Sequence, residues 1–256
     1  MEPTHREQEI LDEIRLAGGS CRIGYLAERL GVSDETIRRN IKSLQARALV
    51  RKVHGGVLLS EGMRLTEQPF QARMRENARA KRQIGAKLAS LVSDGDSLFL
   101  DIGTTTAYAA QALRTKKRLY VVTNSLTVAT TLATINSNRV FFPGGELRAH
   151  DGGAFGGQAI DFIKRFNVQH AVLSVGAIDA NTGFMLHDLG ESDLSRAISE
   201  RAQTRIILAD SSKFTQRAPV TLANQEMLDI LISDTLPPTG IAKMLQKRDI
   251  AHLLAA

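Results

Sequence analysis

The chain has 256 residues, with 33 Lys and Arg against 27 Asp and Glu, so its formal net charge is +6. Its one cysteine, Cys21, excludes an internal disulfide bond and a cysteine-based zinc or iron–sulfur site, as is typical of a reducing compartment. The N-terminal residues have no apolar core, and no apolar run reaches ~18 residues, so we expect neither secretion nor a membrane span. The composition favours a globular, cytoplasmic protein, and its basic excess allows an anionic partner without requiring one.

The first sixty positions carry apolar residues at helical spacing and predict three short helices. Ile10, Ile14 and Ala17 lie on one face of the first helix. A second helix is predicted over 23–30, and the turn at 31–33 separates it from a third helix, with a serine placed to cap its N-terminus. Two helices joined by a glycine-containing turn are typical of a helix-turn-helix.

The third predicted helix has one apolar face, with Ile37, Ile41 and Leu44, and one polar face. At ~100° per residue, the polar face consists of Thr36, Arg39, Lys42 and Ser43. The β-prone runs on either side of His54-Gly55-Gly56 predict a hairpin, or wing. A three-helix bundle with an incidental basic face explains the same periodicity, so spacing alone does not decide between a DNA reader and a structural bundle.

From Asn77 onward, short apolar runs alternate with helix-like stretches. The runs lie at 97–100, 119–122, 140–142, 171–175, 205–209 and 229–232. Continuous apolar strands alternating with helices are typical of a parallel sheet buried on both faces. We therefore predict an α+β protein of two domains: a helix-turn-helix domain at 1–58, a connector at 59–76, and a mostly parallel α/β domain at 77–256.

Polar residues follow the predicted strands at their carboxyl ends, which share one edge of a parallel sheet and commonly hold ligands. In the first such segment, 101–106, a strand is followed by a glycine and three threonines at the start of a helix. Backbone N–H groups there favour a phosphate, although threonines are also ordinary helix caps. The candidate residues at this edge are Asp101, Gly103, Thr104, Thr105, Thr106, Asn124, Gly144, Gly145, Arg148, Asp151, Gly176 and Lys213.

The N-terminal unit resembles the DNA-binding domain of the DeoR family of bacterial transcription repressors. The matching segments are Leu26-Ala-Glu-Arg-Leu-Gly-Val-Ser33, Thr36-Ile-Arg-Arg39 and Arg51-Lys-Val-His-Gly-Gly56. The resemblance implies a winged helix-turn-helix that binds double-stranded operator DNA through Ser33, Thr36, Arg38, Arg39, Lys42, Arg51, Lys52 and His54. Asn40 stands where the family usually has an acidic residue, which would leave Arg38 or Arg39 less restrained.

The second unit resembles the effector domain of the same family, which is similar in fold to sugar-phosphate isomerases. The matching segments are 101–106, 122–125, 144–145, Gly176, 210–214 and 232–234. Gly144-Gly-Glu-Leu-Arg148 with Asp151-Gly-Gly153 is similar to the branch of glycerol-3-phosphate regulon repressors. Two departures are Ser195, where related proteins commonly carry a lysine, and Ala80, where a glutamate often precedes Lys81.

The resemblance implies a repressor, not an enzyme, that leaves its operator when a phosphorylated effector binds. The effector would be glycerol 3-phosphate or another sugar phosphate. Gly103, Thr104 and Thr105 would hold its phosphate, and Asn124, Arg148 and Lys213 would supply further donors. We expect no metal, no cofactor and no membrane partner, and a homodimer or homotetramer, because one winged domain usually reads one half-site.

Two alternatives stay open from the sequence. The chain could be a working sugar-phosphate isomerase, with acid–base groups among Asp101, Asp210 and Lys213, whose N-terminal domain only localises it. The basic segment 73–82 is expected to be a solvated connector and helix start, or to touch DNA.

Overall fold

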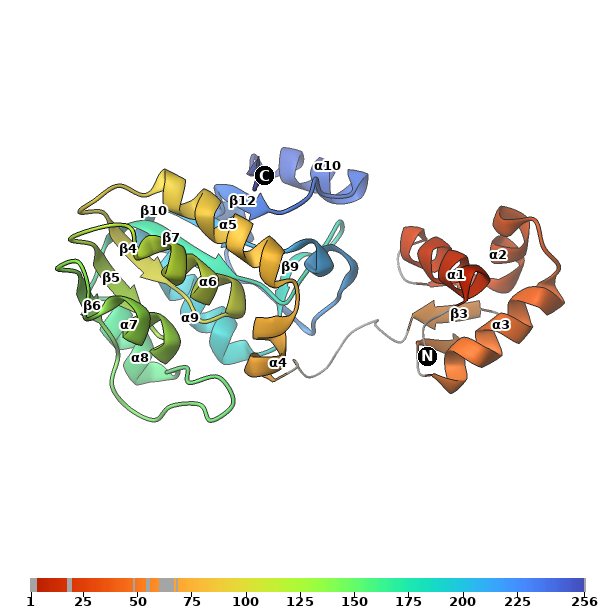
Figure 1. Ribbon diagram of the computed structural model, residues 1–256, viewed down its shortest axis with the longest axis horizontal. Helices are drawn as coiled ribbons and strands as arrows, with labels where there is room; N and C mark the ends of the chain where they lie inside the picture. Colours follow the sequence, from red (N-terminus) through yellow and green to blue (C-terminus); the bar gives the residue numbers. More distant parts are fainter. Residues whose placement is uncertain are drawn as a thin grey trace. The chain divides into compact units, whose positions relative to one another are not determined.

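The computed structural model describes residues 4–17, 20–47, 49–53, 56–59, 67 and 69–255. The chain forms two compact units, one of residues 1–64 with 215–217 and one of residues 65–214 with 218–256 (Figure 1). Each unit has a hydrophobic core of its own. His54, expected in the wing, lies outside the described residues.

The N-terminal unit contains the predicted helices and hairpin, together with a short strand that the sequence did not predict. Its elements are α1 (His5–Leu16), β1 (Ser20–Arg22), α2 (Ile23–Leu30), α3 (Asp34–Ala46), β2 (Val50–Val53) and β3 (Gly56–Leu59). The strands form an antiparallel sheet in the order β1-β3-β2. Strand β1 escapes prediction because three residues are too few to show an alternating pattern.

Local interactions set the angle between α2 and α3. Gly31 adopts the left-handed conformation, with φ of 62°, and ends α2. Ser33 caps α3, since its hydroxyl accepts a hydrogen bond from the Thr36 N–H at 3.3 Å. Ser43, on the predicted polar face of α3, donates to the buried Glu7 carboxylate at 2.6 Å, because that acid needs a partner inside the unit. The capped turn therefore leaves the arginine and lysine face of α3 in solvent.

The second unit is built on a parallel sheet of seven strands, in the order β13-β12-β10-β7-β4-β5-β6. The strands are β4 (Ser97–Leu100), β5 (Tyr120–Thr123), β6 (Arg139–Phe141), β7 (Val168–Ser174), β10 (Ala202–Leu208), β12 (Ile230–Ser233) and β13 (Ala251–Leu254). The predicted mostly parallel α/β fold is confirmed, and each predicted run overlaps one of these strands. Strand β13, which the sequence reading missed, forms one edge of the sheet.

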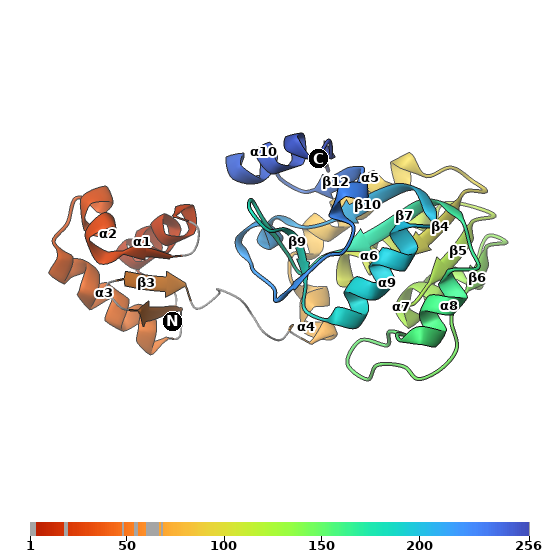
Figure 2. The same ribbon diagram turned by 180° about the vertical axis from the view of Figure 1, so that it is seen from behind.

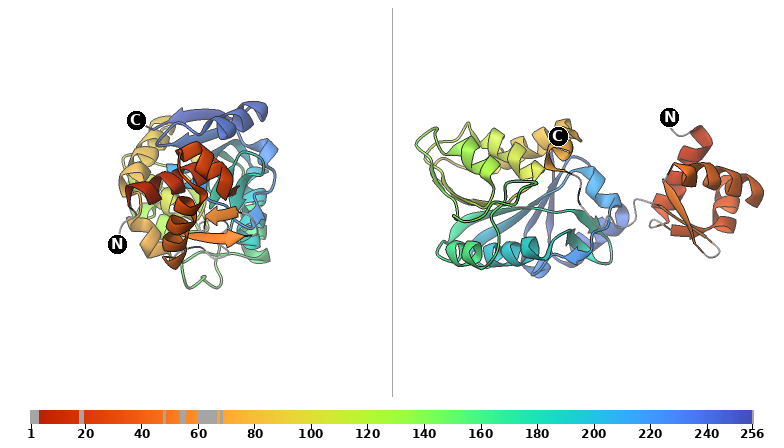
Figure 3. Two further views of the ribbon diagram at one scale, coloured as in Figure 1. Left: turned by 90° about the vertical axis from the view of Figure 1, so that its right-hand side faces the viewer. Right: turned by 90° about the horizontal axis from the view of Figure 1, so that it is seen from below.

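Helices cover both faces of this sheet (Figures 2 and 3). They are α5 (Ala78–Leu91), α6 (Thr104–Leu113), α7 (Leu126–Leu132), α8 (Gly157–Ile163), α9 (Leu189–Ser199) and α10 (Thr239–Lys247). Apolar residues of α5, α6 and α7 join one core cluster, and those of α8, α9 and α10 join the other. A small antiparallel sheet of β8 (Ala177–Asp179), β9 (Gly183–Leu186) and β11 (Val220–Thr221), and short 3-10 turns η1 (Ser211–Thr215) and η2 (Gln225–Met227), complete the unit.

Part of the expected connector at 59–76 is structured. Leu59 ends β3, and helix α4 (Phe70–Arg75) follows Pro69, whereas 60–66 and 68 lie outside the described residues. The basic segment 73–82 is not uniformly solvated, because Lys81 is only 3% exposed. Its ammonium donates to the carbonyl oxygens of Arg73 and Glu76 at the end of α4, which ties α4 to α5. In the described part of the chain, no helix is long and apolar enough to cross a membrane.

Gly85 makes possible the close packing of α5 on α6. A Cβ atom there would lie 2.9 Å from the carbonyl oxygen of Tyr108 and 3.1 Å from the Cα of Ala109. We expect Gly85→Ala to destabilise this unit by ~1–3 kcal/mol from overpacking, against a gain of ~1 kcal/mol in helix propensity. Gly157→Ala is the control, because a Cβ atom added at this helical glycine would meet no other atom within 4 Å. It should leave stability unchanged or raise it by ~0.5 kcal/mol. Urea unfolding measures both, and equal stability of the two variants would contradict the packing argument.

Candidate functional site

The sheet order reverses between β4 and β7, and this reversal marks the candidate site. From β4 the chain proceeds through β5 to β6 on one side, and from β7 through β10 to β12 and β13 on the other. The connections after β4 and β7 therefore leave in opposite directions, which opens a crevice at the carboxyl ends of an open parallel sheet. Asp101, one of the predicted residues, follows β4 directly and therefore lies at this point.

Helix α6 begins at the reversal without a side-chain cap. Its N-cap is Gly103, and no side-chain cap hydrogen bond is found among the described residues. A Cβ atom at Gly103 would lie 2.2 Å from Ser174 Oγ, so only glycine fits between β7 and the helix. Thr104 and Thr105 are 5% and 3% exposed, while Thr106 is fully buried and donates to the Gly103 carbonyl at 2.9 Å. The N–H groups of the first turn, rather than the Thr106 hydroxyl, can receive an anion here.

Asp101 is a buried carboxyl group without an ionic partner at bonding distance among the described residues. Burial raises its pKa to about 8, and the nearby Glu191 carboxylate adds to this. One oxygen accepts from the Ile102 N–H at 2.7 Å, and the other lies 3.5 Å from the Ser195 hydroxyl. At neutral pH the group is therefore mainly protonated and can donate as well as accept.

The Asn124 side chain lies near Asp101 and is fully buried. It lies close enough to lower the pKa of Asp101, yet neither amide atom has a hydrogen bond of ordinary geometry within the described residues. A buried amide that lacks hydrogen bonds carries a desolvation cost of ~1–3 kcal/mol, which a bound polar ligand would relieve.

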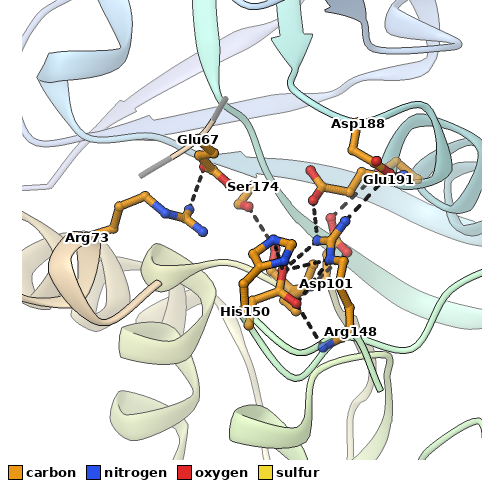
Figure 4. A network of polar contacts seen from close by, with 12 residues as sticks. Glu67, Arg73, Asp101, Arg148, His150, Ser174, Asp188 and Glu191 are labelled. Atoms are coloured by element: carbon orange, nitrogen blue, oxygen red, sulfur yellow. Dashed lines mark hydrogen bonds and ion pairs between the residues drawn. The ribbon is translucent and has the colours of Figure 1, made fainter. Parts of the chain in front are cut away.

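Arg148 is surrounded by carboxylates (Figure 4). Its guanidinium bonds to Asp151 at 2.5–3.2 Å and to Glu191, and its Nη1 lies 3.6 Å from Asp188. It also lies 4.0 Å from the centroid of the Phe155 ring. Burial opposes its charge, but the hydrogen bonds that Arg148 donates to Asp151 and the charge of Glu191 raise its pKa. The positive charge of Arg148 is thus balanced by the carboxylates around it, and the main role of Asp151 is as its counter-ion.

Glu191 is the main residue of this cluster that sequence reasoning missed. Burial raises its pKa to about 7, the charge of Arg148 opposes the shift, and the charges of Glu67 and Asp188 add to it. It lies within the segment 190–197, which was noted only for Ser195. Carboxyl groups that share a guanidinium in this way are suited to accept hydrogen bonds from the hydroxyl groups of a polyol.

Lys213 belongs to a second group of charges at the same edge. It lies on η1, and burial lowers its pKa, while the carboxylates of Asp210 and Glu67 oppose the shift. Asp210 also accepts from Asn77 Nδ2 at 2.8 Å, which links η1 to the start of α5. Glu67, Arg73 and Lys81 complete this group and were not expected, because runs of charged residues are usually solvated.

Three predicted glycines lie outside these clusters. Gly144 and Gly145 are exposed in the loop after β6. The backbone N–H of Gly176 donates to Met185 at 2.8 Å, beside β8 and β9, and a Cβ atom there would lie 2.6 Å from His187 Nδ1. Gly176 is therefore required by close packing at the small sheet.

Four of the predicted DNA-binding residues lie together on the surface of the N-terminal unit. A surface hollow of about 380 Å³ is lined by Arg38, Arg39 and Lys42 of α3 and by Lys52 of the wing strand β2, among others. Arg51 is also exposed. Asn40 donates back to the Thr36 carbonyl at 2.8 Å, and Arg38 lies 4.0 Å from Asp34, so Arg38 has a weak partner on its own helix.

Two family models match the chain. A DeoR-like helix-turn-helix domain matches residues 6–62, and a DeoR C terminal sensor domain matches residues 76–235. The chain belongs to the DeoR family. The glycerol-3-phosphate regulon repressor of Escherichia coli (strain K12) is 33% identical over 250 residues, or 98% of each chain. The HTH-type transcriptional repressor CsqR of the same strain is 32% identical over 92% of this chain and 90% of its own. These relatives confirm the resemblance found in the sequence.

Solved structures match parts of this DeoR-family chain at low identity. Ribose 5-phosphate isomerase A from Methanocaldococcus jannaschii has 16% identity and a TM-score of 0.40, covering 54% of this chain and 55% of its own. eIF2B beta from Chaetomium thermophilum has 13% identity and a TM-score of 0.43, covering 67% of this chain and 56% of its own. The fold itself is established by the parallel sheet described above.

The raised pKa of Asp101 predicts how the stability of the sensor unit depends on pH. The unfolded carboxyl titrates near 3.8 and the folded one near 8, so between these values the folded state holds a proton that the unfolded state has lost. Stability should therefore fall as pH rises through this window. Asp101→Asn removes the contribution, so the variant should gain stability over wild type as pH rises from about 5 to about 9. Part of the decrease in stability with rising pH should remain in the variant, because the pKa of Glu191 is also raised.

Urea unfolding at several pH values measures this gain. Asp161→Asn, at an exposed carboxylate on α8, is the control and should follow wild type at every pH. A parallel pH profile for Asp101→Asn and wild type would show that the Asp101 carboxyl is ionised in the folded chain.

Proposed function

We propose that the chain is a transcriptional repressor that binds operator DNA through α3 and the β2–β3 hairpin, and that a phosphorylated sugar or polyol releases it. The observation that carries the proposal is the site at the reversal of sheet order. There the uncapped start of α6 lies at the same edge of the sheet as the unsatisfied Asn124 amide and the acidic cluster around Arg148. Such a site offers N–H groups to a phosphate and carboxyl groups to hydroxyls.

We favour glycerol 3-phosphate as the effector, with another sugar phosphate as the alternative. Relatives named glycerol-3-phosphate regulon repressor are 33% and 32% identical, in Escherichia coli and Haemophilus influenzae. A relative from Escherichia coli O157:H7, 27% identical, is named a putative aga operon transcriptional repressor, which supports keeping the alternative. We assign no reaction to the site, since named relatives over nearly the whole chain are repressors.

The proposal includes assembly and location. A winged reader usually contacts one half-site, so we expect a homodimer or homotetramer on a pseudo-symmetric operator. It would act in the cytoplasm, where the operator DNA lies. In the DNA complex, Arg39, Thr36 and Lys42 would face the major groove, and Arg38, Arg51 and Lys52 would contact phosphates.

Effector binding should weaken DNA binding, and DNA should weaken effector binding by the same factor. The full chain and a duplex obtained by in vitro selection are titrated by fluorescence anisotropy at fixed salt, with glycerol 3-phosphate, ribose 5-phosphate and hexosamine phosphates. We expect one of them to lower the DNA affinity by ~5–150-fold. The controls are glycerol, which has the polyol without the phosphate, and inorganic phosphate, which has the phosphate without the polyol. An unchanged DNA affinity with every phosphorylated compound would refute the sensor role.

Arg39 and Lys52 should contribute differently to DNA binding. Arg39→Ala should cost ~1–3 kcal/mol on the selected site and reduce discrimination between sites, because a groove-facing guanidinium reads bases. Lys52→Ala should weaken all duplexes alike and reduce the slope of log affinity against log salt by about 1, because a phosphate contact releases counterions. Lys164→Ala, at an exposed lysine in the sensor unit, is the control. Equal loss of discrimination in both variants would contradict this division of roles.

A further inference from the structure

Glu67 and Arg73 form a largely buried ion pair that the proposed function does not use. Glu67 Oε1 lies 2.5 Å from Arg73 Nη1, and the side chains are 18% and 12% exposed. The Arg73 guanidinium also lies 5.7 Å from the centroid of the Phe70 ring, one turn away on α4. A guanidinium held at this depth needs a counter-anion, because an unpaired buried charge is strongly destabilising.

The helix that carries Arg73 is anchored to the helix that begins at the candidate site. The Tyr108 hydroxyl of α6 donates to the Met74 carbonyl of α4 at 3.0 Å. Lys81 holds the same, C-terminal end of α4 by donating to the carbonyl oxygens of Arg73 and Glu76. Arg73 is therefore held in a fixed place relative to α6.

Glu67 interacts with both the basic group and the acidic cluster. Its negative charge acts on Lys213 and on Glu191. In Figure 4 the Arg73 guanidinium points toward Glu67, and Ser174 is drawn between this pair and the cluster that contains Asp101, Arg148 and Glu191. The Glu67 carboxylate is thus the anion paired with Arg73, and its charge also acts on Lys213.

We propose that Arg73 is an effector-binding residue that holds the effector's phosphate together with the N–H groups at the start of α6, and that the Glu67 carboxylate pairs with Arg73 until the effector displaces it. The proposal rests on the sensor function proposed above and adds the group with which the ligand must compete. A carboxylate and a phosphate present similar paired oxygens to a guanidinium, so the exchange keeps Arg73 paired. A phosphate monoester carries about −1.5 to −2 charges at pH 7, which suits two cations better than the single charge of Glu67.

Displacement of Glu67 also changes how the chain that precedes α4 is held. Glu67 is the first described residue of the second unit, which begins at Leu65. Its pair with Arg73 therefore holds the first described residue of this unit against helix α4, which is itself anchored to α6. An effector that replaces Glu67 binds the detached state in preference to the attached one, and this difference in affinity is what a ligand needs to shift a conformational equilibrium.

Glu67→Gln tests the proposal, because it keeps the shape of the side chain and removes its charge. The full-length variant should bind glycerol 3-phosphate, or whichever phosphorylated compound wild type binds, about tenfold more tightly in isothermal titration calorimetry, since the internal competitor is lost. Without effector it should bind the selected duplex more weakly than wild type. The further loss of DNA affinity on adding effector should shrink to less than about twofold, because the attachment is already broken.

Two further variants complete the test. Glu226→Gln, at an exposed glutamate of the same unit, should match wild type in every measurement. Glu67→Gln with Arg73→Gln leaves no unpaired charge, so it should fold if the single variant does not, and it should bind effector at least tenfold more weakly than wild type because a phosphate ligand is lost.

The outcomes separate this inference from the proposed function. If wild type binds no phosphorylated compound, the sensor role fails and this inference falls with it. If wild type binds and responds, but Glu67→Gln shows the same effector affinity and the same change in DNA affinity, Glu67 does not compete with the effector. Full effector affinity in the double variant would remove Arg73 from the site.

Discussion

The arrangement of the sensor unit depends on one constraint, the reversal of sheet order between β4 and β7. The chain leaves these neighbouring strands in opposite directions. It continues from β4 into α6, which packs on one face of the sheet, and from β7 into the small sheet of β8 and β9. Gly103 makes this crossing possible, since any side chain there would collide with Ser174. The crevice brings the start of a helix, a buried amide and several carboxyl groups to the same edge of the sheet.

The charges at this edge are balanced by each other rather than by solvent. Arg148 is enclosed by Asp151, Glu191 and Asp188, and Arg73 is paired with Glu67. Burial keeps Asp101 mainly protonated, with Ser195 near it in place of a cation. A ligand group that binds among these paired charges has to exchange partners with them, and the selectivity for a ligand depends on which exchanges leave no group unpaired.

Much of the fold follows from patterns in the sequence, because helical and strand periods are local properties. The three helices of the reader and the six apolar runs of the sensor are clear in this way, as is the cap at Ser33. Strands β1, β8, β9 and β11 lie in the small antiparallel sheets, outside the alternation of apolar runs and helices that reveals the parallel sheet. Among the site residues, Thr104 and Asn124 follow from strand ends, whereas Glu67, Arg73 and Glu191 do not. A charged side chain is buried only where folding supplies its partner, and that partner is distant in sequence.

The separate hydrophobic cores of the two units have an evolutionary consequence. The reader is packed around residues such as Ile14, Leu26 and Ile37, none of which contributes to the clusters on either face of the sensor sheet. Mutations that reshape the pocket for a new metabolite therefore need not disturb the packing that presents α3 to DNA. A lineage with this architecture can change what it senses while still regulating the same genes, or acquire new target genes while sensing the same compound.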